Sequence, residues 1–263
     1  MWNLTLRETL GLNILLERVS NILTLNMFDY VYFISEPYIY HNPRLEALIA
    51  ECHPSSDVSL NRQQLTDADI EIVVQQAINN KQCKSLSLGF NEITSKGAST
   101  LANALYNNTT LHELWLSTNH LSDTGVYYLA QALLVNKTLK KLGLASNDIT
   151  NTGAFHLAEM LKKNQTINTL GLAMNKIGNE GVQILADTLA QQNTNLQIIT
   201  LDRNQMVSDL SVNSLTNMIK YNRSIKELWI NDCNLSEKGK KKLQGAIESN
   251  RAFKLVTTCV KSS

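Results

Sequence analysis

A nearly repeated twelve-residue segment recurs along the chain at a fixed interval. The segment LWLSTNHLSDTG starts at Leu114, and close variants of it start at Leu86, Leu142 and Leu170, so that successive copies are 28 residues apart. A period between about 20 and 50 residues is typical of stacked supersecondary units, each too small to bury its own apolar face. The sequence therefore predicts a solenoid rather than a globular domain with one central core.

Each unit contains two apolar residues two positions apart, as expected for a short strand with one buried face. The pairs are Val58/Leu60, Leu86/Leu88, Leu114/Leu116, Leu142/Leu144, Leu170/Leu172, Ile199/Leu201 and Leu228/Ile230. The segments that follow, such as GASTLANAL and GVYYLAQAL, have apolar residues at helical spacing. We therefore expect seven strand–helix units within residues 57–250.

The two ends of the chain are expected to close this array. Residues 1–56 are predicted to be an N-terminal capping region, with a helix over 3–23, an extended segment over 27–40 and a degenerate first repeat whose helix is RLEALIAEC. Residues 251–263 are predicted to contain a truncated strand, with Val256 one period after Leu228, and a short tail.

A polar residue recurs three positions after the second apolar residue of each strand. The residues at this position are Gln63, Asn91, Asn119, Asn147, Asn175, Asn204 and Cys233. A side-chain amide has both donors and an acceptor, so it can satisfy backbone groups that a tight turn buries. Recurrence in register therefore favours a structural ladder over a catalytic role for any one of them.

An apolar plug follows each ladder position, and a hydroxyl residue mostly follows the plug. The expected plugs are Leu65, Ile93, Leu121, Ile149, Ile177, Met206 and Leu235. The expected helix N-caps are Thr66, Thr94, Ser122, Thr150 and Ser236. The unit that begins at Ile199 has one extra residue in QQNTNLQ and another within 207–210, which we interpret as drift rather than a recognition loop.

The recurring pattern LxxLxLxxNxL, over roughly residues 45–258, resembles the leucine-rich repeat. Its 28-residue length with a full helix is similar to the ribonuclease-inhibitor-type subclass. The resemblance implies an α/β horseshoe with a parallel β-sheet on the concave side and α-helices on the convex side. Similar repeats occur in ribonuclease inhibitor, in the sensor region of NOD-like receptors and in the activating protein of the GTPase Ran. This sequence contains neither a GxxxxGK(S/T) phosphate loop nor an acidic tail.

Side chains between and just after the strand leucines are expected to face the concave surface. Trp115 and Trp229 lie in one such row, four strands and about 19 Å apart at sheet spacing. Tryptophan is enriched among binding hot spots. The predicted protein-binding residues are Trp115, Trp229, Glu113, Lys141, Asp202, Arg203, Glu227, Asn231 and Asp232. The alternative is that the tryptophans pack over neighbouring glycines and contribute only stability.

Little else in the sequence indicates chemistry. The five histidines occupy unrelated repeat positions and the four cysteines have no CxxC spacing, so we expect no enzyme, metal or cofactor. Cys83 and Cys233 fall at core and ladder positions, where we expect reduced thiols. Triplets of the form Asn-x-Ser/Thr recur at one repeat position, which indicates turn chemistry rather than glycosylation.

Charge and hydropathy do not favour nucleic acid or membrane as a partner. The net charge is +1, and no run of 18 apolar residues occurs. Lys238, Lys240, Lys241 and Lys242 are expected to be a solvated face of the last helix. The N-terminus lacks the apolar core of a signal peptide, so we expect the protein to lie in the cytoplasm. We also expect it to be a monomer.

These features favour a non-catalytic module that binds a protein or peptide partner across its concave sheet. One alternative is a GTPase-activating protein similar to the activator of Ran, which would place an Asn and charged strand-end residues against a GTPase. Another is the sensor fragment of a NOD-like receptor. Stimulated GTP hydrolysis would distinguish the first alternative, and a longer transcript the second.

Overall fold

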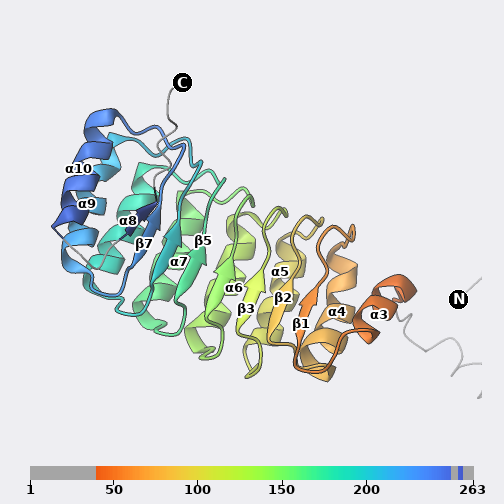
Figure 1. The fold of residues 1–263 in the computed structure, drawn as a ribbon. Coiled ribbons are helices and arrows are strands. Elements are labelled where there is room, and N and C mark those ends of the chain that lie inside the picture. Colours follow the sequence, from red (N-terminus) through yellow and green to blue (C-terminus); the bar gives the residue numbers. More distant parts are fainter. Residues whose placement is uncertain (1–39, 250–253, 257–263) are drawn as a thin grey trace, which may run out of the picture. The chain divides into compact units, whose positions relative to one another are not determined.

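The computed structural model describes residues 40–249 and 254–256, the latter as backbone only. Residues 41–263 form one compact unit in which the strands lie side by side and the helices cover one face of the sheet (Figure 1). The predicted helix over 3–23 and most of the extended segment over 27–40 lie outside the described residues. The repeat array itself is therefore what the structure describes.

The strands form one eight-stranded parallel sheet in sequence order. The strands are β1 (Asp57–Ser59), β2 (Ser85–Ser87), β3 (Glu113–Trp115), β4 (Lys141–Gly143), β5 (Thr169–Gly171), β6 (Ile198–Thr200), β7 (Glu227–Trp229) and β8 (Lys254–Val256). Leu114 pairs with Leu142, and Leu142 pairs with Leu170, so the sequence period is the register of the sheet. The predicted α/β repeat solenoid is confirmed.

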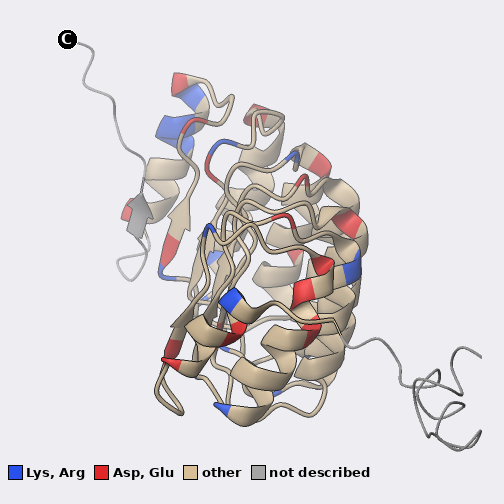
Figure 2. Ribbon diagram, turned by 90° about the vertical axis from the view of Figure 1, so that its right-hand side faces the viewer, with Lys and Arg blue, Asp and Glu red and all other residues tan. Residues whose placement is uncertain are grey.

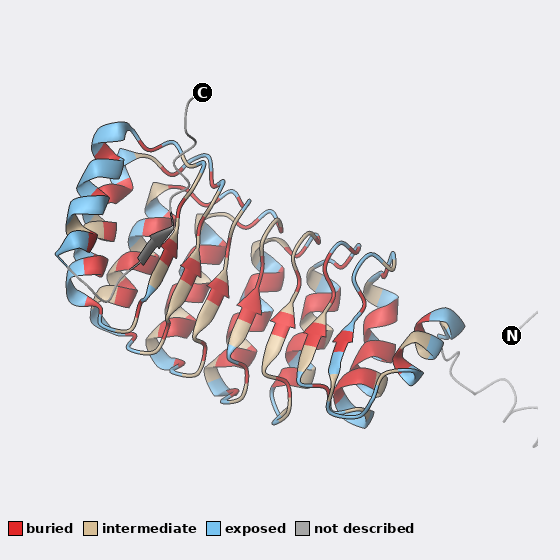
Figure 3. Ribbon diagram, viewed as in Figure 1, coloured by how far each residue is buried: buried red, intermediate tan, exposed pale blue. Residues whose placement is uncertain are grey.

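Helical segments connect successive strands. They are α3 (Pro43–Ala50), η1 (Asp67–Asp69), α4 (Ile70–Val73), η2 (Val74–Asn80), α5 (Ser95–Leu105), α6 (Ser122–Val135), α7 (Asn151–Lys163), α8 (Asn179–Gln191), η3 (Asp209–Ser211), α9 (Val212–Tyr221) and α10 (Glu237–Glu248). Each helix turns its apolar face toward the sheet and its polar face outward (Figure 3). The helix α3 lies where the sequence predicts the helix of a degenerate first repeat.

The core is continuous along the array because each repeat buries its apolar residues against the next. Within one unit, Leu114, Leu116 and the plug Leu121 are fully buried. Cys83 is 0% exposed in the apolar position just before β2, as predicted for a core residue. The array therefore has no single centre, and its stability is a sum over neighbouring repeats.

The predicted register is wrong at two places near the C-terminal end. Met206 is 54% exposed, and Val207, which is 0% exposed, is the buried plug instead, because the extra residue in this unit shifts the turn by one position. In the last strand, Leu255 rather than Val256 pairs with Leu228, so that step is one residue shorter than the period.

The predicted N-caps are present in some helices and absent in one. Thr94, Thr150 and Ser236 accept hydrogen bonds from backbone N–H groups of the first helical turn. Ser122 does not act as a cap; it has φ 54° and begins α6 itself.

Candidate functional site

A ladder of buried asparagines holds the turn that follows each strand. The amide of Asn175 accepts from the backbone N–H groups of Asn147 and Ile149 at 2.9 and 3.1 Å. It donates to the carbonyls of Leu144 and Leu172, both at 3.0 Å. Asn91, Asn119, Asn147 and Asn204 make equivalent bonds to their neighbouring repeats. These bonds occupy the amides fully with backbone groups, so the geometry is structural.

The two ends of this ladder differ from its middle. Gln63 donates to the carbonyl of Asn61 and accepts from the side chain of Arg44, rather than bonding to backbone groups of the preceding repeat. Cys233 has a thiol in place of the amide, and its Sγ donates to the carbonyl of Leu201 at 3.4 Å. Burial raises the pKa of the Cys233 thiol to about 11, which keeps it protonated at neutral pH.

A second asparagine ladder lies where each helix ends. Asn164 donates to the carbonyls of Leu133 and Asn136 at 2.7 and 3.3 Å and accepts from the N–H groups of Thr166 and Ile167. Asn136, Asn193 and Asn222 make the same set of bonds. The recurring Asn-x-Ser/Thr triplets are the only sequence signal for this ladder. Its amides are buried, which supports the turn interpretation of those triplets.

On the concave face, Trp115 belongs to a cluster on β3 and β4. Its Nε1–H donates to Oε2 of Glu113 at 3.2 Å, and Lys141 Nζ lies 2.7 Å from the other carboxylate oxygen. The indole ring lies over Gly143, where an added Cβ would be 2.4 Å from Cε3 of the tryptophan. Trp115 is therefore half-buried and held in one orientation by a carboxylate and a bare glycine.

Trp229 belongs to a matching cluster on β7. Its Nε1–H donates to Oε2 of Glu227 at 3.0 Å, and it is also half-buried. Glu227 pairs in register with Lys254 of β8, as Glu113 pairs with Lys141. The strand sequence Glu-Leu-Trp thus occurs twice, four strands apart, with the same indole–carboxylate bond.

The remaining predicted binding residues lie beside Trp229. Asp202 accepts from both the backbone N–H and the side-chain amide of Asn231, each at 2.7 Å. Arg203 forms an ion pair with Asp232 at 3.1 Å. The structure therefore brings the predicted residues into two groups, one on β3–β4 and one on β6–β7 and the turns after them, with β5 between the groups.

The floor between the two groups carries almost no side chains. Gly143 and Gly171 are adjacent in register, and a Cβ added to Gly171 would come no closer than 3.5 Å to any atom, the nearest being Cα of Gly143. Ala145 and Ala173 follow them in the next row. Because the Trp115 indole covers Gly143, a partner side chain placed in this row would meet sheet backbone at Gly171.

Two hollows mark the surface. One, of about 240 Å³, lies at the start of β1–β3 and is lined by Asp57, Lys84, Ser85, His112 and Glu113, so it adjoins the Trp115 cluster. Nδ1 of His112 lies 2.6 Å from the carbonyl of Thr110, an acceptor, so this nitrogen carries a proton. The opposite ring nitrogen is then the one able to accept a partner's hydrogen bond.

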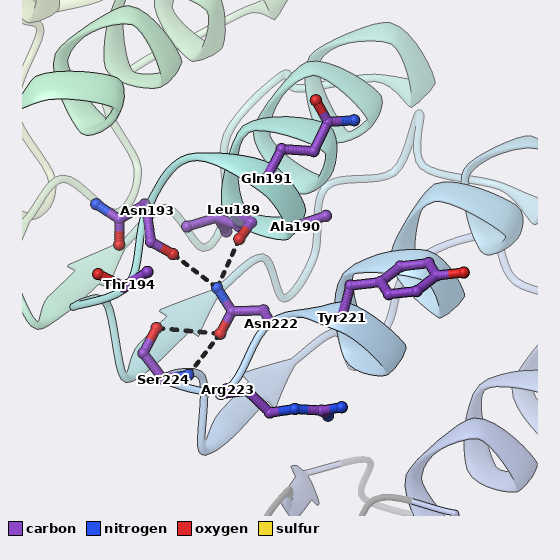
Figure 4. Close-up of a pocket in the computed structure, with 9 residues that line it drawn as sticks. All are labelled: Leu189, Ala190, Gln191, Asn193, Thr194, Tyr221, Asn222, Arg223 and Ser224. Carbon is purple, nitrogen blue, oxygen red and sulfur yellow. Dashed lines mark hydrogen bonds between the residues drawn. The ribbon is translucent and has the colours of Figure 1, made fainter.

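The other hollow, of about 220 Å³, lies between the ends of α8 and α9 (Figure 4). Its centre is Asn222, whose amide donates to the carbonyls of Leu189 and Asn193 and accepts from Ser224. Because these bonds belong to the second ladder, the hollow is a seam between two repeats.

Other kinds of site are not found in the described part of the chain. Among residues 40–249 and 254–256 no group of three or more His, Cys, Asp or Glu side chains could hold a metal ion. Within the same residues, no helix is long and apolar enough to cross a membrane.

Comparison with known proteins identifies the repeats. A family model described as leucine-rich repeat matches residues 84–102, 107–130, 135–158 and 163–186. Over these residues the chain is similar to leucine-rich repeats, in agreement with the parallel sheet of the repeat array. A search of curated proteins found no match.

Solved structures provide partial matches. One is Leiomodin-1 Actin-Binding Site 2, at 23% identity and a TM-score of 0.41, covering 48% of this chain and 74% of that one. Another is the tropomodulin C-terminal domain of Caenorhabditis elegans, at 19% identity and a TM-score of 0.49, covering 59% of this chain and 93% of that one.

Proposed function

We propose that this protein is a non-catalytic interaction module that binds a protein or peptide partner on its concave sheet, with Trp115 and Trp229 as the two anchors. The observation that carries this proposal is the repeated indole–carboxylate bond, Trp115 to Glu113 and Trp229 to Glu227. Solenoids use their extended concave surfaces for such binding. We also assign the repeats to the ribonuclease-inhibitor-type subclass, because α5 to α8 each provide a full helix of 11 to 14 residues per unit.

The indole–carboxylate bonds reduce the cost of binding. A side chain that is already fixed in one rotamer loses little conformational entropy when a partner covers it. Each indole N–H is satisfied within the chain, so a partner can cover the ring with apolar atoms and leave no donor unpaired. The bare floor between the anchors lets a partner approach the sheet closely, and the charged hollow beside Glu113 offers a polar rim.

A two-stage binding experiment tests the proposal. Immobilised wild-type protein and the double variant Trp115→Ala/Trp229→Ala capture proteins from a cell lysate, and a protein retained by the wild type is then purified for affinity measurements. We expect the double variant to bind that partner at least about 100-fold more weakly, because truncation of each hot-spot residue costs about 2 kcal/mol or more. Thermal melts followed by circular dichroism establish that the variant is folded.

The convex face supplies the matched control. Tyr128 and Phe155 are exposed aromatic residues on α6 and α7, on the opposite side of the array. The double variant Tyr128→Ala/Phe155→Ala removes the same kind of side chain and is expected to leave the affinity unchanged. If the purified partner binds the folded tryptophan variant as tightly as the wild type, the concave anchors are structural and the proposal is wrong.

A further inference from the structure

The irregular unit exposes an aliphatic side chain to solvent. Leu210, in η3, is 80% exposed, more than any other large hydrophobic residue in the described part of the chain. Met206, displaced from the plug position by the extra residue, is exposed on the same turn region. A single exposed leucine is normal on a protein surface and indicates nothing by itself. What Leu210 can bind depends on the residues around it.

The segment that carries Leu210 contacts the last helix through residues on either side of Leu210. Its neighbour Asp209 accepts hydrogen bonds from Ser236, at the start of α10. Those bonds, together with the nearby charge of Lys238, lower the pKa of the Asp209 carboxyl. On the other side, Lys242 donates to the side chain of Asn213 at 2.5 Å. The loop that carries Leu210 is therefore attached to the first turns of α10, beside two lysines.

The outer face of α10 is basic and uncovered. The buried residues of this helix are Gly239, Leu243 and Ile247. At helical spacing, Lys238 and Lys241 lie on the opposite, exposed side, and Lys242 lies at its edge toward α9 and is also exposed. An added Cβ at Gly245, on this side, would find nothing within 4 Å. Figure 2 shows Lys and Arg positions, in blue, on the helix near the C-terminal end of the array.

We infer that Leu210 with Lys238, Lys241 and Lys242, here called the basic corner, docks on an anionic lipid surface. Clustered lysines are attracted to a negatively charged membrane surface, and an aliphatic side chain beside them can insert at the headgroup boundary. The low net charge, which argues against a membrane partner for the chain as a whole, conceals this local concentration. Two acidic residues lie in this region: Glu237 is paired with Lys240 at 2.8 Å, and Asp209 offsets part of the charge of Lys238.

The same chemistry fits other partners less well. Nucleic acid would be attracted to the lysines but would have no use for a projecting leucine, and α10 carries no aromatic residue on which bases could stack. A protein partner would need a pocket complementary to Leu210, whereas a lipid surface accepts any exposed aliphatic group. The basic corner would lie on the membrane surface and would not cross the membrane.

Vesicle binding by the full chain tests this inference. The probes are vesicles of pure phosphatidylcholine and vesicles with about 30% phosphatidylserine, at about 100 mM salt, where the surface charge is only partly screened. We expect binding to the anionic vesicles only. The triple variant Lys238→Ala/Lys241→Ala/Lys242→Ala should lower the partition coefficient about 100-fold, since each lysine contributes about fivefold. Leu210→Ala should lower it about tenfold.

Matched variants separate this surface from the rest of the molecule. Lys162→Ala/Lys163→Ala on α7 and Tyr128→Ala on α6 remove the same kinds of side chain elsewhere and should leave vesicle binding unchanged. The variant Trp115→Ala/Trp229→Ala should also leave vesicle binding unchanged. The vesicle experiment therefore tests the basic corner independently of the concave-face proposal. Equal melting temperatures show that each variant is folded.

Three results would overturn the inference. The first is that the wild type does not bind anionic vesicles, and the second is that the control lysines matter as much as those of α10. The third is binding to a short duplex DNA that depends on the α10 lysines but not on Leu210, without vesicle binding, which would make this surface a nucleic-acid contact.

Discussion

A Cβ atom placed on Gly153 would lie 2.5 Å from Oδ1 of Asp123, a residue of the preceding repeat. That oxygen accepts from the backbone N–H groups of Gly153 and Thr150 at 2.9 and 2.8 Å, so one repeat caps the helix of the next. The same relationship holds for Asp67 with Gly97 and for Asn151 with Gly181. Asp209 is also close to an added Cβ on Gly239, but it accepts from the N–H of Ser236 instead. In the irregular unit the glycine is replaced by Ser211, whose hydroxyl donates to Asn179.

Replacing Gly153 with alanine should therefore destabilise the protein, although alanine is normally the better helix former. The added methyl group meets both the carboxylate of Asp123 and a methyl group of Ile149 at 2.5 Å. We expect the free energy of unfolding to fall by about 2 kcal/mol, which is typical of overpacking with loss of a cap. Urea denaturation followed by circular dichroism measures this change.

Gly245 provides the opposite case within the same protein. It lies inside α10 with nothing within 4 Å of an added Cβ. Gly245→Ala should therefore stabilise the protein by up to about 1 kcal/mol, the intrinsic helix preference of alanine. Equal effects of the two substitutions would contradict the role assigned to Asp123 as an inter-repeat cap.

The amide of Asn175 should not tolerate conversion to a carboxylate. In Asn175→Asp, the group that donates to the carbonyls of Leu144 and Leu172 becomes an acceptor facing acceptors, with a buried charge. We expect a loss of about 3 kcal/mol or more at pH 7. Because a protonated carboxyl can donate one hydrogen bond, the loss should be smaller near pH 4. Urea titrations at both pH values test this.

Asn107 is the control for this substitution. It is exposed just after the end of α5. Asn107→Asp makes the same chemical change without burying a charge, so it should alter stability by less than about 0.5 kcal/mol. A comparable loss at both positions would mean that the ladder bonds are not what stabilises the turns.

The sequence predicts the strands well because their register follows directly from the period. Leu86, Leu114, Leu142 and Leu170 are equally spaced, and each pairs with the next in the sheet. Prediction fails where the spacing changes. Between Asn204 and Leu215 two apolar residues, Met206 and Val207, are adjacent, and counting cannot decide which one is buried. Only the position of the extra residue in three dimensions decides it.

The candidate site is predicted less completely than the fold. Alternation along a strand places Trp115 on the concave face, but it gives neither the indole–Glu113 bond nor the position of the ring over Gly143, because both depend on a side-chain rotamer. The cap of Asp123 on Gly153 was likewise missed, since it joins residues of different repeats. The glycine that recurs near the start of the helices was the sequence signal from which this cap could have been predicted.

Thr118 should be replaced by asparagine with a gain in stability. It has φ 58°, a left-handed conformation that is unfavourable for a β-branched residue. The equivalent residues of the other units also have positive φ: Arg62, Phe90, Ser146, Met174, Arg203 and Asp232. Asparagine tolerates this region, so Thr118→Asn should raise the free energy of unfolding by about 1 kcal/mol. Denaturant titration measures the gain.

The control for this effect is a threonine in ordinary helical conformation. Thr124 is exposed in the first turn of α6. Thr124→Asn makes the same replacement where the two residues have similar helix preferences, so little change is expected. If both substitutions shift the stability equally, backbone strain at Thr118 is not the cause.

The buried thiols should be unreactive in the folded protein. Burial raises the pKa of Cys83 and of Cys233 to about 11, from a usual value of 9.0. Since the thiolate is the nucleophile, a rise of this size lowers its population about 100-fold at pH 8. Iodoacetamide labelling resolved by peptide mass spectrometry should show that both cysteines react at least about 100-fold more slowly in the native protein than in urea. Native rates similar to unfolded rates would contradict the assigned burial.

The same shift makes stability depend on pH. A thiol whose folded pKa is raised favours the folded state at every pH below its unfolded value, and this advantage is lost as pH rises from about 9 to about 11. The wild type should therefore lose more stability over that pH range than the variant Cys83→Ala, which lacks the thiol. The variant keeps the lysines and tyrosines, which titrate in the same pH range. Urea titrations at intervals from pH 8 to about 11 compare the two proteins, and parallel pH profiles would show that ionisation of Cys83 is not linked to folding.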